Sequence, residues 1–314
     1  MSKFFVTGGS GFIGSHLADK LINEGNQITV YDNLVSGKKK DIEHLIGKME
    51  FGFIQADMLD FEKLTTSMKG HDIVWHLGAN TDIPNGNKLT DLDLNNCTIA
   101  THNVLESMRQ NDIKKILFAS SATVYGDMPS VSLSENIGPL LPISLYGAGK
   151  LACEGLISSY CHLFDIQAWI FRFSNVVGGG MGHGVIYDFI QKLRKNPNKL
   201  EVLGDGNQEK PYFLVEDCID GMLFAFRHSD NQYDVFNLGC DSITPVKRIA
   251  QIIIDEMELK NVRIEYTGGR RGWPGDAPEV HFNVDKMKKL GWCPNHSSNE
   301  AVKIAARRLL NGQR

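Results

Sequence analysis

Two residues with complementary acid–base chemistry lie four positions apart near the middle of the chain. Tyr146 and Lys150 stand in the segment Tyr-Gly-Ala-Gly-Lys, which opens a predicted helix, so both fall on one helical face. A free tyrosine has a pKa of about 10 and is a poor base at neutral pH, whereas a neighbouring ammonium stabilises the phenolate. The pair could therefore remove a proton from a hydroxyl group, with Tyr146 as the base.

A glycine-rich segment near the N-terminus predicts a binding site for a dinucleotide. The segment reads Thr-Gly-Gly-Ser-Gly-Phe-Ile-Gly over residues 7–14, between an expected strand and a helical pattern. Glycine permits positive φ and lets a pyrophosphate approach the backbone, and the helix start offers unpaired N–H groups to the anion. The residues expected to contact the dinucleotide here are Gly8, Gly11, Phe12, Ile13 and Gly14.

An acidic residue at the end of the second expected strand indicates which dinucleotide binds. Asp32 can accept hydrogen bonds from the adenosine ribose hydroxyls, and Asn33 follows it directly. A carboxylate here would repel the 2′-phosphate of NADP, so the sequence favours NAD. Three lysines at 38–40 keep NADP open as an alternative, although a solvated loop is the simpler interpretation of them. With NAD bound, hydride would leave the same carbon whose hydroxyl Tyr146 deprotonates.

Alternating strand and helix patterns place these residues in one fold. Short apolar runs followed by helical patterns are typical of βαβ units and a parallel sheet. The predicted class is α/β, a Rossmann-type doubly wound parallel sheet with a smaller C-terminal α/β substrate lobe. Strands are expected at 3–7, 27–31, 51–55, 73–77, 115–119 and 167–171, and helices before Gly25, at 144–163 and at 299–310.

The alternation ends after Asn175, where glycines follow at 178–180. A chain of 314 residues exceeds the usual size of one hydrophobic core, so we expect two lobes. The predicted domains are an NAD-binding domain over 1–175, to which part of 214–240 returns, and a substrate-binding lobe over 176–314.

Composition argues against a nucleic-acid binder. Hydrophobic residues make up 42% of the chain and charged residues 22%, and the formal net charge is −4. Nucleic-acid binders normally carry a basic face. The N-terminus lacks a signal-peptide pattern, and no apolar run approaches the length of a membrane span. We therefore expect a cytoplasmic protein with a small-molecule substrate and with neither nucleic acid nor membrane as a partner.

The cysteines are scattered without any C-x-x-C pair, so no metal site is expected. Free thiols are the favoured state, because a chain this large does not need disulfides for stability. Disulfides are the alternative. The six cysteines are Cys97, Cys153, Cys161, Cys218, Cys240 and Cys293.

Taken together, the glycine segment, the Ser-Ser-Ala-Thr-Val-Tyr-Gly run at 120–126 and the Tyr-x-x-x-Lys pair resemble the extended short-chain dehydrogenase/reductase family. The resemblance covers nearly the whole chain. Within the family it is greatest to the NAD-dependent UDP-glucose/UDP-galactose 4-epimerases, notably at 121–127 and 184–188. It implies that Ser121 hydrogen-bonds the reacting hydroxyl, that Asp57 and Met58 lie near the adenine, and that Leu77 and Ala79 pass beside the cofactor.

The same resemblance implies a nucleotide-sugar substrate. Lys210 stands where the family usually has an arginine, so a point charge replaces a bidentate fork. Arg270 and Arg271 are shifted by a small insertion, which leaves open which of them reaches the diphosphate. Cys97 stands where the family often has an asparagine, for which Asn95 and Asn96 could compensate. The implied substrate contacts are Ser121, Asn175, Val185, Leu203, Lys210, Arg271 and Asp276.

The residues after Ser121 favour epimerisation over elimination. Related 4,6-dehydratases carry an Asp-Glu pair there, whereas this chain has Ala122 and Thr123. The simplest remaining reaction is oxidation at C4, rotation of the 4-keto sugar and return of hydride to the opposite face. A dehydratase with unusual acids, a decarboxylase, a dehydrogenase or reductase that releases its cofactor, and a non-catalytic NAD sensor remain alternatives.

The identity of the sugar stays open. Val280 falls where hexose epimerases carry a bulky residue near C2, so an N-acetyl group could be admitted beside the unsubstituted hexose. A GDP-sugar, a uronate and a heptose also remain possible substrates. By the same resemblance we expect a homodimer, formed through the helices near 95–110 and 144–163.

Overall fold

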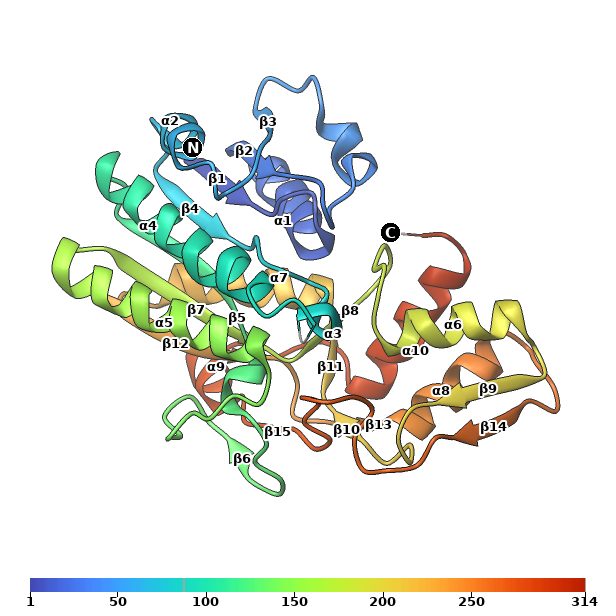
Figure 1. The fold of residues 1–314 in the computed structure, drawn as a ribbon. Coiled ribbons are helices and arrows are strands. Elements are labelled where there is room, and N and C mark those ends of the chain that lie inside the picture. The colour runs from blue at the N-terminus through green and yellow to red at the C-terminus, as the bar shows by residue number, and fades with distance from the viewer. Residues whose placement is uncertain (87, 314) are drawn as a thin grey trace. The chain divides into compact units, whose positions relative to one another are not determined.

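The computed structural model describes residues 1–86 and 88–313, and residue contacts divide it into two compact units (Figure 1). Unit 1 comprises Met1–Val124, Ser144–Arg172 and Met222–Phe236. Unit 2 comprises Tyr125–Ile143, Phe173–Gly221 and Asn237–Arg314. The domain division at residue 175 stays a prediction. The units differ from it by grouping 125–143 with the C-terminal part.

Unit 1 is built on a seven-stranded sheet with the order β12-β7-β5-β4-β1-β2-β3. The pairs β1–β2, β1–β4, β2–β3 and β4–β5 are parallel. The strand bounds are β1 Lys3–Thr7, β2 Gln27–Asp32, β3 Phe51–Gln55, β4 Ile73–His76, β5 Lys115–Ser121, β7 Gln167–Phe173 and β12 Tyr233–Leu238. All six predicted strands are present within a residue or two of their expected ends, and β12 was not predicted as a strand.

The parallel register brings the ends of the central strands to one edge of the sheet. Thr7 pairs with Tyr31 on β2 and with His76 on β4. The residues that follow β1, β2, β4 and β5 therefore gather at the carboxyl edge, where open α/β sheets bind their ligands.

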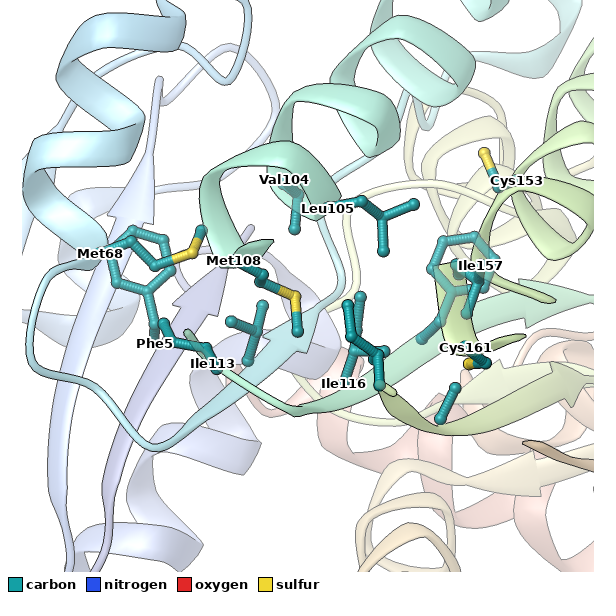
Figure 2. Packing of buried hydrophobic residues seen from close by; sticks show 14 of the residues in the cluster. Phe5, Met68, Val104, Leu105, Met108, Ile113, Ile116, Cys153, Ile157 and Cys161 are labelled. Atoms are coloured by element: carbon teal, nitrogen blue, oxygen red, sulfur yellow. The ribbon is translucent and has the colours of Figure 1, made fainter. Parts of the chain in front are cut away.

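Three helices, α2 (Phe61–Met68), α4 (Ala100–Gln110) and α5 (Leu145–Phe164), cover one face of this sheet. Figure 1 shows α4 and α5 running side by side, and their residues are in contact. Their apolar sides meet the sheet in a single buried cluster, part of which is drawn in Figure 2. Phe5, Val104 and Ile116 are fully buried in it. Burying a side chain of this kind stabilises the fold by about 1.5–3 kcal/mol.

The other face packs against α1 (Phe12–Asn23) and the end of α7 (Val215–His228). Phe226 contacts Trp75 of β4 at 6.2 Å and Trp169 of β7 at 5.0 Å between ring centroids. Helix α1 ends as predicted, because Gly25 has a φ of 81° and donates its N–H to the carbonyl of Ile22.

Several short elements complete unit 1. A π-helical turn, η2, immediately precedes α4, so the helix expected near 95–110 begins with wider turns. The bounds of these elements are η1 Lys39–Leu45, α3 Ile83–Gly86, η2 Leu94–Ile99 and η3 Ala122–Tyr125, whose last residue belongs to unit 2.

Unit 2 combines small sheets with a helical core. The helices are α6 Val185–Lys195, α8 Val246–Glu256, α9 Asp285–Leu290 and α10 Ser298–Leu310, of which α6, α8 and α10 pack against one another. A capping box of Ser297 and Glu300 begins α10, as predicted within a residue. The paired strands are β6 Ser132–Leu133 with β15 His281–Phe282, β8 Asn175–Val177 with β11 Tyr212–Leu214, β9 Lys199–Val202 with β14 Arg263–Tyr266, and β10 Glu209–Lys210 with β13 Thr244–Pro245.

All six cysteines are free thiols, so the disulfide alternative is wrong. In the described part of the chain, no helix is both long and apolar enough to cross a membrane.

A buried ion pair ties α5 to two strands of unit 1. Glu154 accepts hydrogen bonds from the Nε and Nη2 atoms of Arg172 at 3.0 and 2.7 Å, and from the hydroxyl of Ser120 at 2.5 Å. The side chains of Arg172 and Glu154 are 5% and 4% exposed. Because Ser120 precedes Ser121 and Glu154 lies one turn after Lys150, the pair fixes the strand and helix that carry the predicted catalytic residues.

We expect Glu154→Leu to lower the free energy of unfolding by about 3–5 kcal/mol, because the Arg172 guanidinium stays buried without its carboxylate partner. Urea denaturation measures this loss. Arg227→Gln is the matched control: it breaks the exposed pair with Glu24 and should cost less than about 1 kcal/mol. Equal losses of unfolding free energy in the two variants would show that burial does not make the Glu154–Arg172 pair more stabilising than an exposed pair.

Candidate active site

The glycine segment forms a tight turn between β1 and α1 in which side chains have no room. Gly8 has a φ of 68°, and a Cβ on it would lie 2.7 Å from the backbone of Gly78. A Cβ on Gly14 would lie only 2.2 Å from the carbonyl oxygen of Gly8. The turn thus brings the start of α1 against the end of β1, which leaves its backbone open to a close-lying ligand.

The first turn of α1 carries donors suited to an anion. Its N-cap is Gly11, and no side chain caps the helix. The first turn also holds no acidic residue that would repel a negative charge. Phe12 and Ile13 begin the helix, so their N–H groups belong to the end that bears partial positive charge.

Asp32 lies at the end of β2 and binds the glycine turn directly. One carboxylate oxygen accepts the N–H of Ser10 at 2.9 Å, and the other accepts the N–H of Leu34 at 2.8 Å. Burial raises the pKa of Asp32, and the two backbone donors oppose that rise. Each oxygen keeps a further lone pair, so ribose hydroxyls can still be bound.

The other predicted cofactor contacts lie near this edge of the sheet. Asn33 donates to the carboxylate of Asp57 at 2.8 Å, which joins the ends of β2 and β3. The side chain of Met58 packs on Gly78, between the predicted contacts Leu77 and Ala79. The structure therefore brings these five residues close to the glycine turn.

Ser121, Tyr146 and Lys150 form a compact polar cluster at the ends of β5 and α5. Helix α5 begins at Ser144, whose hydroxyl accepts the N–H of Gly147 at 3.1 Å. Ser121 lies close enough to Tyr146 for its side chain to lower the pKa of the phenol by hydrogen bonding, which is the smallest of the effects on that pKa. Lys150 donates from Nζ to the carbonyl of Ala119 at 2.6 Å, and Nζ lies 5.7 Å from the centroid of the Tyr146 ring.

Burial and charge act against each other on this pair. Burial raises the pKa of Tyr146, while the ammonium of Lys150 lowers it, and burial prevails in the protein alone. Burial lowers the pKa of Lys150, but Tyr146 and the neighbouring acidic groups together outweigh it, so the pKa is raised. Lys150 is therefore charged at neutral pH, and Tyr146 needs a further positive charge to ionise readily.

A chain of neutral hydrogen-bonding groups crosses the sheet beneath this cluster. Thr7 accepts the N–H of Gly78 and binds His76 Nδ1 at 2.7 Å, and His76 Nε2 lies 2.9 Å from the hydroxyl of Thr101. Thr101 donates onward to the thiol of Cys153 at 3.1 Å. Burial first, and then Lys150, lowers the pKa of His76 to about 3. His76 is therefore neutral, and the donation from Thr101 to Cys153 favours the tautomer with the proton on Nε2.

Cys97 lies beside the cluster and is 2% exposed, and the two asparagines before it have hydrogen-bond partners of their own. Asn96 donates its side-chain amide to the carbonyl of Leu92 at 2.9 Å, and Asn95 donates to the carboxylate of Asp91 at 3.4 Å. That these asparagines compensate for Cys97 in binding the cofactor stays a prediction.

Unit 2 holds a second cluster, in which basic side chains are paired with acids. Lys210 forms an ion pair with Asp276. Arg271 donates to the backbone carbonyl of Asp276 at 2.6 Å and forms an ion pair with Asp127. Arg270 instead pairs with Glu279 at 2.9 Å. Arg271 is thus the arginine that shares a cluster with Lys210.

The remaining predicted substrate contacts are also in unit 2. Asn175 donates its amide to the carbonyl of Pro211 at 3.1 Å, beside Lys210. Val185 begins α6, and Leu203 lies 46% exposed directly before Gly204. The loop that contains Leu203 lies beside the segment that leads to Arg271, because a β-bridge pairs Gly204 with Gly268.

The sequence reasoning missed a buried acid near the candidate catalytic cluster. Asp93 is 1% exposed, its backbone carbonyl lies beside Gly149 of α5, and its charge raises the pKa of both Tyr146 and Lys150. An acidic residue between leucines at 92 and 94 gave no sign of burial, because charged residues are mostly exposed.

The residues present fit NAD: a glycine turn that excludes Cβ atoms, an uncapped helix start and a strand-end carboxylate. Across the described residues, no cluster of three or more His, Cys, Asp or Glu side chains could hold a metal ion.

Comparison with known proteins agrees with this geometry. A model of the NAD dependent epimerase/dehydratase family matches residues 4–239. A putative UDP-glucose 4-epimerase of Methanocaldococcus jannaschii is 34% identical, over 98% of this chain and 99% of that protein.

Two solved structures share the fold over nearly their full length. A UDP-galactose 4-epimerase is 37% identical with a TM-score of 0.88, over 98% of this chain and 99% of that one. A UDP-glucuronic acid 4-epimerase from Bacillus cereus, solved with UDP-glucuronic acid and NAD, is 25% identical with a TM-score of 0.89, over 98% and 99% of the two chains.

These matches confirm the predicted fold class, family and cofactor. The chain belongs to the NAD dependent epimerase/dehydratase family, within the extended short-chain dehydrogenases/reductases, and its cofactor is NAD.

Proposed function

We propose that this enzyme inverts C4 of a UDP-activated hexose through a transient 4-keto sugar. The observation that carries the proposal is the cluster of Ser121, Tyr146 and Lys150 at the carboxyl edge of an NAD-binding sheet. The 4-epimerases among the similar proteins support the choice of reaction.

Tyr146 takes and returns the proton of the C4 hydroxyl. Lys150 stabilises its phenolate through the charge at Nζ, and Ser121 holds the reacting hydroxyl by a hydrogen bond. When bound, NAD supplies a hydride acceptor that gives the hydride back, so the cycle leaves no net redox change. The 4-keto sugar rotates in the site before the hydride returns, so the hydride adds to the opposite face of C4. Tyr146 then reprotonates the oxygen, and the configuration at C4 is inverted.

The cofactor is held by the edge of the sheet described above. The backbone at Gly8, Gly11 and Gly14 and the first N–H groups of α1, at Phe12 and Ile13, bind the pyrophosphate. Asp32 binds the adenosine ribose, and Lys150 holds the nicotinamide ribose. The other proposed contacts, near the adenine and along the cofactor, are Asn33, Asp57, Met58, Leu77 and Ala79.

The basic cluster of unit 2 binds the nucleotide diphosphate. Arg271 offers a planar fork and Lys210 a point charge, and Asp276 orients both. We favour Arg271 over Arg270 because Arg270 is directed to Glu279. Further substrate contacts are proposed at Asn175, Val185 and Leu203.

Elimination of water is less well supported than epimerisation. Ala122 and Thr123 form η3 directly after Ser121, where neither side chain can act as an acid or a carboxylate base. The remaining acid near Tyr146, Asp93, is buried. A dehydratase would need an exposed acid and base at the sugar.

The homodimer stays a prediction, and the exposed side of α5 supports it. Leu145 and Leu163 are 38% and 71% exposed on this helix, with Ala148, Ala152 and Gly155 also exposed along it. Small residues flanked by leucines allow two helices to approach closely, which suits a four-helix contact with a second copy.

Gly14→Ala should weaken NAD binding by about tenfold or more, because its Cβ would collide with the carbonyl of Gly8 and open the turn. Isothermal titration of the purified protein with NAD measures the dissociation constant. Gly52→Ala is the control, since a Cβ there makes only ordinary contact at 3.4 Å. Unchanged affinity in Gly14→Ala would mean that the turn does not hold the pyrophosphate.

Tyr146→Phe should retain NAD and lose turnover by about 10²–10⁴-fold, because the ring remains while the base is gone. Proton NMR of UDP-glucose incubated with wild type and variant follows the appearance of the C4 epimer. Accumulation of free NADH in the wild-type reaction, or wild-type rates in the variant, would contradict the proposal.

UDP-N-acetylglucosamine should be epimerised about as well as UDP-glucose, because Val280 is small. Val280→Leu should then reduce kcat/KM for the N-acetyl sugar by about tenfold relative to that for UDP-glucose, by overpacking the site. The ratio of the two substrates within one variant controls for any loss of folded enzyme. Turnover of only the unsubstituted hexose by the wild type would rule out an N-acetyl site at this position.

A further inference from the structure

Asp93 is a buried acid that the proposed reaction does not use. It is 1% exposed and precedes η2, and its side chain does not cap that turn. One carboxylate oxygen accepts the amide N–H of Asn80 at 2.9 Å. The other oxygen, Oδ2, has no hydrogen-bond partner among the residues that the structure describes.

Asp93 packs against the turn of α5 that carries the catalytic pair. Gly149 lies directly before Lys150, and a Cβ on it would lie 3.3 Å from the carbonyl oxygen of Asp93 and 3.8 Å from its Cβ. On the other side, a Cβ on Gly86 would lie 2.3 Å from Oδ2. Because Gly86 and Gly149 have no side chains, Asp93 can pack closely against the turn of α5 that holds Lys150.

The charge of Asp93 depends on Lys150. Burial raises the pKa of Asp93, and the hydrogen bond from Asn80 and the ammonium of Lys150 lower it. An ionised oxygen without a donor is costly in a buried site, and the hydrogen bond from Asn80, followed by the attraction of Lys150, offsets part of that cost. An ionised Asp93 in turn raises the pKa of Tyr146.

The histidine and thiols near the pair are neutral at pH 7, and Glu154, one turn along α5, forms an ion pair with Arg172. His76, at the end of β4, has a pKa lowered to about 3 by burial. Burial raises the pKa of the Cys153 thiol on α5 to about 11, and raises that of Cys97 on η2. Within the described cluster, Asp93 is therefore the acid that shares the charge of Lys150 with Tyr146.

We propose that Asp93 and Tyr146 compete for the ammonium of Lys150, so that the charge of Asp93 sets the pH at which Tyr146 becomes a base. Asp93 acts through Tyr146 and is a positioning residue rather than a catalytic one. When Asp93 is protonated, the whole attraction of Lys150 is available to the phenolate. The inference rests on the proposed function, in which Tyr146 is the base. The electrostatic coupling of Asp93 and Tyr146 through Lys150 can be measured without substrate.

The test is a titration of Tyr146 in the full chain saturated with NAD. Tyrosinate absorbance in the ultraviolet follows its ionisation, and subtraction of the Tyr146→Phe spectrum isolates this residue. Asp93→Asn keeps the size of the side chain and removes its charge. We expect the pKa of Tyr146 to fall by about one unit or more, and the acidic limb of the kcat profile to move with it.

Asp91→Asn is the matched control, since Asp91 is an exposed acid two residues away, and it should leave the titration unchanged. Asn80→Ala is a second variant, for use if Asp93→Asn does not fold. It removes the donor to Asp93 and should shift the pKa of Tyr146 downward as well, because Asp93 then stays protonated to higher pH.

An unchanged or raised pKa of Tyr146 in Asp93→Asn, or in Asn80→Ala, overturns the inference. A lowered pKa without any epimerisation of UDP-sugars would uphold the coupling and reject the proposed function. The two failures are therefore distinguishable, because one is read from absorbance and the other from NMR.

Discussion

The burial of one ammonium group is the constraint on which unit 1 depends. Lys150 is 2% exposed, and an isolated charge in such a place would cost several kcal/mol. Its Nζ donates to the carbonyl of Ala119 at 2.6 Å and lies 4.8 Å from the centroid of the Phe118 ring. Both partners belong to β5, so the strand must hold its place against α5. Glu154, on the next turn of α5, supplies that hold by accepting from Ser120 of β5, while its ion pair with Arg172 fixes it to β7.

Burial and the same ammonium together keep the polar chain near the site neutral. Burial is the larger cause of the lowered pKa of His76, and a positive charge there would also be repelled by Lys150. A neutral imidazole can accept from Thr7 and donate to Thr101, so it joins β1, β4 and α4 without changing the charge near Tyr146. The hydrogen bonds of this chain thus make the site rigid. Because the chain is neutral, only a few charged groups act on the pKa of Tyr146.

The sequence predicted what depends on local patterns and missed what depends on distant partners. The six strands and the glycine turn follow from apolar runs and from steric limits at Gly8 and Gly14, which act over a few residues. Strand β12 was missed because its run of Tyr233–Leu238 follows a long stretch of other structure and joins the sheet beside β7. The burial of Asp93 and the pairing of Lys210 with Asp276, 66 residues away, arise from tertiary contacts that no spacing announces.

The pairing in unit 2 bears on how an acidic protein can bind a diphosphate. Lys210 and Arg271 already have carboxylate partners in Asp276 and Asp127, so a phosphate would exchange with existing ion pairs instead of meeting free charge. Such exchange lowers the net gain in affinity, because the displaced carboxylate must be solvated again. It also favours ligands whose phosphates match the spacing of both cations, since a single phosphate contact would not offset the free-energy cost of breaking an ion pair. At the proposed site, selectivity for a diphosphate over a single phosphate would therefore follow from the acids that pair with the cluster as much as from its bases.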